Sequence, residues 1–123
     1  APLHYAAAAG HTNVIRYLVE VRGVDPRTLA ANGMSALHFA IEQGRVETVQ
    51  YLSGFAALLS MDLLGDSPLH LAVVMGNPDM VNILVEAGCD TGLTNQAGET
   101  AADVALKTGM VNVVRLLRQG RPL

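Results

Sequence analysis

Two segments combine a serine with a histidine three residues later, the residue types of a hydrolytic site. Ser35 precedes His38, and Ser67 precedes His70, with Asp66 beside the second serine. A serine nucleophile needs a base within hydrogen-bonding reach and an oxyanion site. Each serine instead stands at a position typical of a helix N-cap, where its oxygen accepts hydrogen bonds from backbone amides. We therefore expect no catalysis, and we expect this spacing to leave no base within reach of either serine.

Three histidines, His4, His38 and His70, have the residue type of a zinc site. They occupy equivalent points of successive units, and packed helices lie about 8 to 10 Å apart. Zinc requires ligand nitrogens at about 2 Å, so three such rings cannot converge on one ion. The glycines of the chain lack the Lys-Ser/Thr of a phosphate loop. We predict no metal and no cofactor, and we interpret the single cysteine, Cys89, as a small packed apolar residue.

The histidines are evenly spaced because the chain repeats itself. Each Leu-His pair is followed six residues after the histidine by a glycine, and a fourth glycine keeps the same spacing. The pairs are Leu3-His4, Leu37-His38 and Leu69-His70, and the glycines Gly10, Gly44, Gly76 and Gly109 are 34, 32 and 33 residues apart. A fixed period of this length indicates a solenoid built from one supersecondary unit.

The third unit shows most clearly which elements carry these residues. Ser67-Pro68 is a helix start signal and predicts a short helix over 69–75 that ends at Gly76. Asn77-Pro78 repeats that signal for a second helix through Met80–Val85. The segment 88–98 then predicts an extended loop or hairpin before the cap at residue 100.

Neither helix is long enough to be stable alone, so the core must form by stacking. Three columns of equivalent small or apolar residues are expected to form that core. They are Ala6, Ala40, Ala72 and Ala105; Leu3, Leu37, Leu69 and Ala102; and Val14-Ile15, Thr48-Val49, Met80-Val81 and Val113-Val114.

The chain resembles the ankyrin repeat family throughout its length. The motifs that carry the resemblance are Pro2-Leu3-His4-Tyr5-Ala6-Ala7, Gly10-His11, Ser35-Ala36-Leu37-His38-Phe39-Ala40, Ser67-Pro68-Leu69-His70-Leu71-Ala72, Gly88-Cys89-Asp90 and the closing form Thr100-Ala101-Ala102-Asp103-Val104-Ala105. The resemblance implies an all-α solenoid of stacked helix-turn-helix ankyrin repeats with connecting β-hairpin loops. It also implies that the repeated histidine is structural and bonds loop backbone between repeats.

We expect a single domain over residues 1–123, with repeats at about 1–34, 35–66, 67–99 and 100–123. The first repeat lacks its leading hairpin, and we expect the chain to be a fragment or a trimmed piece of a longer protein. Repeat one carries an extra residue around Glu20–Gly23. Repeat two has Gly54–Leu59 in place of the Gly-Ala-Asp loop, so the register of 54–64 is ambiguous.

Composition and charge narrow the function classes. Half of the 123 residues are apolar, the net charge is -3, and no apolar run is long enough to span a membrane. With one cysteine and no glycosylation sequon, we expect a cytoplasmic or nuclear protein. Residues 46–106 contain acids but no Lys or Arg. Nucleic acid is therefore not expected as a partner, because phosphate binding needs clustered basic residues.

The resemblance implies that partners bind a concave face built from hairpin tips and first helices. Candidate partner-binding residues at those positions are Met34, Phe39, Glu42, Gln43, Leu63, Leu64, Asp66, Val74, Met75, Glu99 and Lys107. The middle of this face is apolar and ringed by acids, which predicts a partner with apolar anchors and basic flanks. A distorted second hairpin is the alternative, in which Leu58, Leu59, Leu63 and Leu64 fold back into the core.

We conclude from the sequence that the chain is a non-catalytic protein interaction module that binds a partner peptide or protein. No small-molecule substrate and no membrane insertion are expected. The alternative is a structural or regulatory ankyrin segment of a larger enzyme, channel or scaffold protein. The fold by itself does not separate these two, because one fold hosts many functions.

Overall fold

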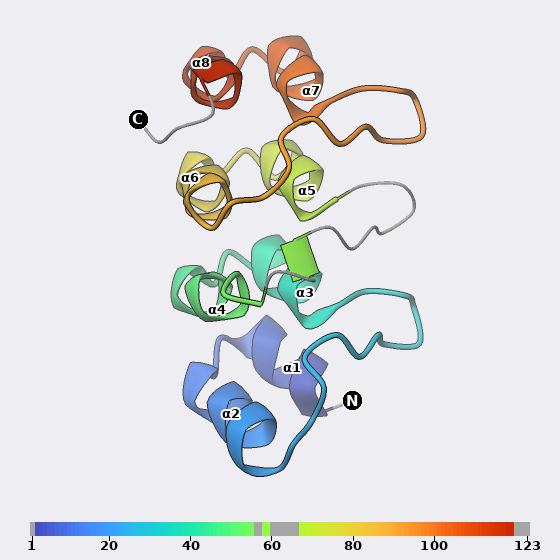
Figure 1. Ribbon diagram of the computed structural model, residues 1–123, viewed down its shortest axis with the longest axis vertical. Coiled ribbons are helices and arrows are strands. Elements are labelled where there is room, and N and C mark those ends of the chain that lie inside the picture. Colours follow the sequence, from blue (N-terminus) through green and yellow to red (C-terminus); the bar gives the residue numbers. More distant parts are fainter. Residues whose placement is uncertain (1, 56–57, 60–66, 120–123) are drawn as a thin grey trace.

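The computed structural model describes residues 2–55, 58–59 and 67–119. For residue 119 it describes the backbone but not the side chain. In this part of the chain, helices follow one another in antiparallel pairs that stack along one axis (Figure 1). One layer holds the first helices of the pairs, α1 (Pro2–Ala9), α3 (Ala36–Glu42), α5 (Pro68–Val74) and α7 (Ala101–Lys107). The other holds the second helices, α2 (Thr12–Arg16), α4 (Val46–Leu52), α6 (Pro78–Glu86) and α8 (Val111–Gln119). The predicted all-α repeat solenoid is confirmed.

Several helices begin directly after residues that the sequence predicted as N-caps. The hydroxyl oxygens of Ser35, Ser67 and Thr100 each accept a hydrogen bond from the backbone amide three residues later. Asn77 caps α6 by accepting bonds from the amides of residues 79 and 80, and Pro78 follows at the first turn. Such caps satisfy amide donors that a helix start leaves without partners. Gly76 closes the preceding turn with φ 71°, a backbone conformation that favours glycine.

The core lies between the layers and follows the predicted columns. The alanine column, Ala6, Ala40, Ala72 and Ala105, is at most 3 % exposed. Small side chains there let neighbouring first helices approach closely. Leu3, Leu37 and Leu69 are buried as well, whereas Ala102 is only half-buried. The third column is buried except for Val14, which is 46 % exposed. The prediction for Val14 is wrong because it lies on the outer side of α2, facing away from the other repeats.

A π-helical segment, η1 (Tyr17–Val21), continues α2. Its hydrogen bonds span five residues, as in the bond from the Arg22 amide to the Tyr17 carbonyl oxygen at 3.1 Å. A π-helical turn holds one residue more than the corresponding α-helical stretch. Gly10 and Gly23 are one residue further apart than Gly76 and Gly88. The extra residue of repeat one is therefore accommodated inside its second helix.

The described loops turn back as hairpins without forming a sheet. The amide of Ala30 donates to the Met34 carbonyl at 2.9 Å, and the amide of Asn95 donates to the Glu99 carbonyl at 2.8 Å. One isolated antiparallel bridge joins Thr94 and Thr100. The predicted hairpin loops are thus present after repeats one and three as tight turns, and the described residues contain no extended strand.

The loop after α4 departs from this pattern. Leu58 is fully buried and Leu59 is 6 % exposed, and both belong to the hydrophobic core. For these two residues the alternative of a distorted hairpin that folds back into the core is the one observed. The other leucines named in that alternative, Leu63 and Leu64, lie outside the described residues.

Candidate partner-binding face

The first helices expose two adjacent positions at their carboxyl ends, which we call the first-helix face. These positions lie two residues and one residue before the glycines that mark the repeats. They are filled by Ala8, Glu42, Val74 and Lys107, and by Ala9, Gln43, Met75 and Thr108. Except for the two half-buried alanines, all are exposed. Unlike the core columns, this face changes chemistry from one repeat to the next.

Repeat three makes the first-helix face apolar at its centre. Val74 is 59 % exposed and Met75 is 45 % exposed. The fold does not require apolar residues here, because the equivalent positions in repeats two and four hold Glu42, Gln43 and Lys107 among others. Val74 and Met75 thus form a small exposed apolar patch between polar neighbours.

Two other predicted site residues are less accessible. Met34 is 7 % exposed. Its amide donates to Asn32 Oδ1 at 3.0 Å and its carbonyl closes the turn, so the hairpin carries this side chain into the interior. The expectation that Met34 belongs to an exposed apolar patch is therefore wrong. Phe39 is half-buried, and its ring lies 5.7 Å from the ring of His4 in the preceding repeat.

Three further predicted residues, Leu63, Leu64 and Asp66, lie outside the described part of the chain. The apolar centre of the first-helix face is therefore represented in the structure by Val74 and Met75. Both come from the end of α5.

The acids predicted to ring this centre differ in their surroundings. Glu42 is exposed at the end of α3. Glu99 forms an ion pair with Lys107 and accepts a hydrogen bond from Asn95 Nδ2 at 3.3 Å. Two hydrogen bonds lower the pKa of Glu99, and the bond from Lys107 contributes more than the bond from Asn95. Glu99 is thus paired with a basic group of this chain, whereas Glu42 is exposed and forms no ion pair with the other described residues.

The two serine and histidine pairs are closer than the sequence suggested. Ser35 Oγ lies 2.7 Å from His38 Nδ1, and Ser67 Oγ lies 2.8 Å from His70 Nδ1. The expectation that no base lies within reach of either serine is wrong, because the first helical turn folds the ring back over the cap. All four residues are at most 1 % exposed, however, so a substrate has no access to them.

The repeated histidine bonds loop backbone in the first and third repeats. His4 Nε2 donates to the Thr28 carbonyl oxygen at 2.7 Å, and His70 Nε2 donates to the Glu99 carbonyl oxygen at 2.9 Å. A neutral imidazole that donates from Nε2 accepts at Nδ1, so the Ser67 hydroxyl donates to His70. This agrees with the structural role that the resemblance implied. Among the described residues, no three His, Cys, Asp or Glu are arranged to hold a metal ion.

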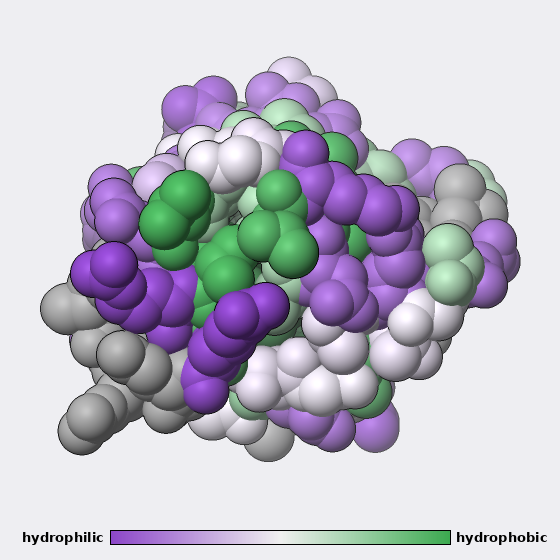
Figure 2. All heavy atoms as spheres, turned by 90° about the horizontal axis from the view of Figure 1, so that it is seen from above, coloured by the Kyte–Doolittle hydropathy of each residue, from purple (hydrophilic) through white to green (hydrophobic). Residues whose placement is uncertain are grey.

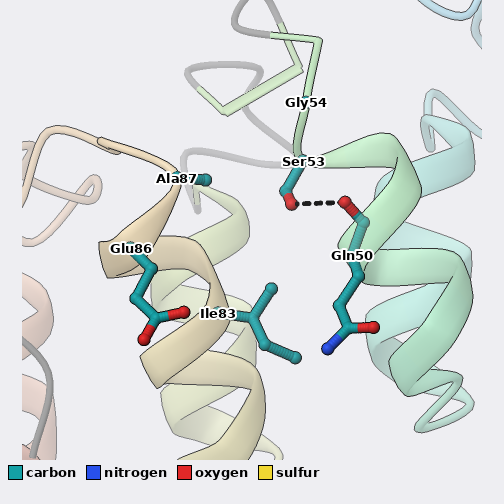
Figure 3. A pocket seen from close by; sticks show the side chains of 6 residues that line it. All are labelled: Gln50, Ser53, Gly54, Ile83, Glu86 and Ala87. Atoms are coloured by element: carbon teal, nitrogen blue, oxygen red, sulfur yellow. Dashed lines mark hydrogen bonds between the residues drawn. The ribbon is translucent and has the colours of Figure 1, made fainter.

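A hollow of about 380 Å³, which no motif of the sequence indicated, lies between α4 and α6 (Figure 3). It is lined by Gln50, Ser53, Gly54, Ile83, Glu86 and Ala87. The Ser53 hydroxyl donates to the Gln50 carbonyl oxygen at 3.0 Å and so does not face the hollow as a free donor. Its lining residues lie on α4 and α6 or directly after them, so the hollow belongs to the layer of second helices rather than to the first-helix face.

Comparison with known proteins agrees with this architecture. A family model described as ankyrin repeats in 3 copies matches residues 1–57 and 54–121. NF-kappa-B inhibitor alpha of Sus scrofa is 36% identical over 107 residues, which cover 81% of this chain and 34% of that protein. Ankyrin repeat and SOCS box protein 11 of Mus musculus is 28% identical over 121 residues, covering 98% of this chain and 37% of that protein.

A transient receptor potential cation channel subfamily A member 1 homolog of Caenorhabditis elegans is 27% identical over 92% of this chain, which covers 9% of the channel protein. The chain thus spans about a third or less of each of these relatives. No helix in the described residues has the length and apolar character needed to cross a membrane. This chain belongs to the ankyrin repeat family, as shown by its repeated motifs, its paired helices and its match to the family model.

Proposed function

We propose that this ankyrin repeat domain, a protein interaction module, binds a peptide or protein segment on its first-helix face. The observation that carries the proposal is the exposure of Val74 and Met75 at positions where the neighbouring repeats hold polar residues. Packing residues recur in every repeat, and a residue that departs from the repeat without serving the core is available for recognition. Ankyrin repeats are typically non-catalytic, and the burial of Ser67 and His70 supports that reading here.

The charges beside Val74 and Met75 define the partner further. Glu42 lies in the neighbouring repeat on the α3 side and is exposed, while Lys107 lies on the α7 side and is paired with Glu99. A partner segment with an apolar anchor over α5 and a basic residue on the α3 side fits this arrangement. Binding a basic residue near Glu99 would require displacement of Lys107, so we place the basic flank beside Glu42.

The test replaces the apolar centre with charge. The double variant Val74→Asp, Met75→Asp should lose its partners in affinity capture from cell lysate followed by mass spectrometry. Both side chains are exposed, so the free energy of unfolding of the variant should change by no more than about 0.5 kcal/mol per substitution. Undiminished capture of the same proteins by this variant would show that another surface binds them.

A matched control comes from the second-helix layer. Val46 is 40 % exposed on α4, so Val46→Asp places one negative charge on an exposed valine away from the first-helix face and matches the single variant Val74→Asp. This control should capture the same partners as the original chain. A second variant, Glu42→Lys, should weaken capture more at low salt than at high salt, because the proposed contact with a basic flank is electrostatic.

A further inference from the structure

The hollow between α4 and α6 differs in origin from the apolar surface at the end of the described stack. Figure 2 views the end formed by α7 and α8, where apolar side chains gather at the centre. Leu106 there is 60 % exposed, whereas Ile41 and Val73, its equivalents in repeats with a neighbour on that side, are each 1 % exposed. Leu106 thus occupies a stacking position of the repeat. The hollow instead lies between two neighbouring repeats, so residues of both line it.

The join between the second helices of repeats one and two shows which side chains can occupy such a space. Arg16 Cζ lies 4.9 Å from the centre of the Tyr51 ring, a favourable cation–π arrangement. The Tyr51 ring in turn meets the Phe55 ring edge-on, with the two ring centres 5.5 Å apart. One cation and two aromatic rings therefore lie together on this side of the stack.

The equivalent positions between repeats two and three hold smaller side chains. Counted from the marking glycines, the replacements are Gln50 for Arg16, Ile83 for Tyr51 and Ala87 for Phe55. The three smaller residues all line the hollow of about 380 Å³, which we call the α4–α6 hollow. It is therefore a space that aromatic and basic side chains occupy one repeat earlier and that this chain leaves open here.

The polar groups beside the α4–α6 hollow can accept hydrogen bonds. Figure 3 shows the Ile83 side chain between those of Glu86 and Gln50. Glu86 is exposed and forms no ion pair with the other described residues. Gln50 is exposed as well, and its side-chain oxygen is a second acceptor. A carboxylate and an amide thus flank an apolar surface.

The charge of this region favours a cation. Both helices that line the α4–α6 hollow end beside it, and the carboxyl end of a helix carries partial negative charge. Residues 46–106 contain acids but no Lys or Arg, so neither α4 nor α6 supplies a basic residue of its own. The helix ends and the Glu86 carboxylate therefore act in the same direction.

An arginine side chain fits these features better than other cations do. Its planar guanidinium can form two parallel hydrogen bonds with one carboxylate and still donate to an amide oxygen. Its methylene stem can pack on the apolar surface of Ile83 while the charged head stays at the wet rim. A lysine ammonium provides a point charge without this planar geometry. Arg16 shows that an arginine side chain can lie across the second helices in this way one repeat earlier.

We propose that the α4–α6 hollow binds an arginine side chain that a partner protein presents. The guanidinium pairs with the Glu86 carboxylate and donates to Gln50 Oε1, and the methylene stem covers Ile83. The site belongs to the layer of second helices. It is therefore separate from the first-helix face and does not depend on the proposed function.

The test titrates the isotope-labelled chain with the capped peptide acetyl-Ala-Arg-Ala-amide and follows the backbone amides by NMR. The amide signals of Gly54, Glu86 and Ala87 should shift, whereas those of the first-helix face should not. Matched peptides carry lysine or citrulline, the neutral analogue of arginine, at the central position. The lysine peptide should bind about three- to fivefold more weakly than the arginine peptide, and the citrulline peptide should cause no measurable shift.

Two substitutions should reduce binding, and a matched control should not. Glu86→Gln removes the charge and should weaken binding of the arginine peptide by about threefold or more. Ala87→Phe restores the aromatic ring that repeat two carries at this position and should block the hollow. Glu47→Gln removes another exposed carboxylate, from the first turn of α4, and should bind like the original chain. All three residues are exposed, so thermal melts should show that the variants remain folded.

A further variant supplies the arginine from within the chain. Gln50→Arg places it at the position that Arg16 holds in repeat one. Its side chain should cover Ile83 and pair with Glu86, so this variant should lose the peptide although the carboxylate is still present. The double variant Val74→Asp, Met75→Asp should bind the peptide like the original chain. A failure of this inference can therefore be told apart from a failure of the proposed function.

Four results would overturn the proposal. The first is a set of amide shifts centred on Glu42, which would place the arginine on the first-helix face. The second is unchanged binding of the peptide to Glu86→Gln or to Gln50→Arg. The third is binding of the citrulline peptide, or of one with phenylalanine at the central position, as tight as that of the arginine peptide. The fourth is the absence of any shift up to the solubility limit of the arginine peptide.

Discussion

The first and third repeats carry the same motif, yet they hold their second helices differently. In repeat three, α6 has nine residues and its N-cap is Asn77, whose side chain accepts hydrogen bonds from two backbone amides. In repeat one, α2 has five residues, its cap residue His11 makes no side-chain bond, and η1 that follows contains no buried residue. The shared motif therefore determines the first helix of each repeat. The form of the second helix depends on its own N-cap and on the number of residues between the two glycines that flank it.

The bonds of the repeated histidine differ in the same two repeats. His70 reaches the carbonyl of Glu99, directly before the cap of the next first helix, whereas His4 reaches the carbonyl of Thr28, earlier in its loop. The third repeat is thus tied to the start of the next helix pair. The histidine of the first repeat bonds instead to the middle of the connecting loop, so we expect the first repeat to be the less stable of the two.

The largest difference should come from truncating equivalent leucines. Leu84 in α6 is fully buried, while its equivalent Leu18 in η1 is half-buried. Leu84→Ala should lower the free energy of unfolding by about 2 to 5 kcal/mol, as for buried leucines in general. Leu18→Ala should cost less than half as much. Urea denaturation followed by circular dichroism measures both values, and equal losses would mean that the two second helices are equally supported.

Hydrogen exchange should reveal the same asymmetry without substitution. Amides in η1 should open locally and be protected at least about tenfold less than those in the second half of α6, because η1 buries no residue fully. Mass spectrometry of peptides covering 17–22 and 81–86 measures this. Equal protection would indicate that the π-helical segment is as stable as α6.

The cap residues offer a smaller effect. Asn77→Ala should destabilise the chain by about 1 kcal/mol, because two amides of α6 lose their acceptor. The matched change His11→Ala removes no side-chain cap bond and should leave the unfolding free energy nearly unchanged. If His11→Ala lowered the free energy of unfolding as much as Asn77→Ala does, capping would not explain why the second helices of repeats one and three differ. Both values come from the same denaturation series.

The smallest expected difference concerns the reactivity of a thiol placed at the equivalent loop position of the third or the first repeat, where the chain has Cys89 and Val24. The pKa of the Cys89 thiol is raised to about 11. Burial of the thiol is the larger cause, and the negative charge of Asp90 is the smaller one. Its alkylation should therefore be slow at neutral pH and accelerate as the pH rises towards that value, because the thiolate is the reactive form. In repeat one, the equivalent of Cys89 is Val24, and the following Asp25 is paired with Arg27 at 3.0 Å.

A chain with Val24→Cys and Cys89→Ser places the thiol in repeat one. Because Asp25 is already compensated by Arg27, this thiol should react a few times faster than Cys89 at the same pH. Iodoacetamide labelling followed by intact mass measures both rates. A slower reaction at residue 24 would show that burial in repeat one exceeds that in repeat three.

The repeat period predicted the fold because the same spacing specifies both the turns and the core columns. It was less informative where a residue's environment depends on its place in the stack. Val14 belongs to a buried column by sequence but lies on an outer side of the stack, and Met34 belongs to an exposed hairpin by position but is drawn inwards by its turn. The close approach of Ser67 to His70 likewise depends on side-chain rotation, which a three-residue spacing does not determine.

The candidate site could be predicted only in part for the same reason. Val74 and Met75 were identifiable because they break the repeat at positions without a packing role, and the structure places both at the surface. The neutralisation of Glu99 by Lys107 joins residues from a loop and a helix end. The linear pattern of charges does not reveal such a pairing.

The π-helical segment η1 also bears on how such arrays change length during evolution. A one-residue insertion in the second helix is absorbed locally, and Gly23 and Asp25 still begin a loop that leads to the cap at Ser35. The glycines and caps, rather than helix length, therefore preserve the alignment between neighbouring units. A second helix can accordingly accept one added residue without changing which residues of the neighbouring units face solvent or the core.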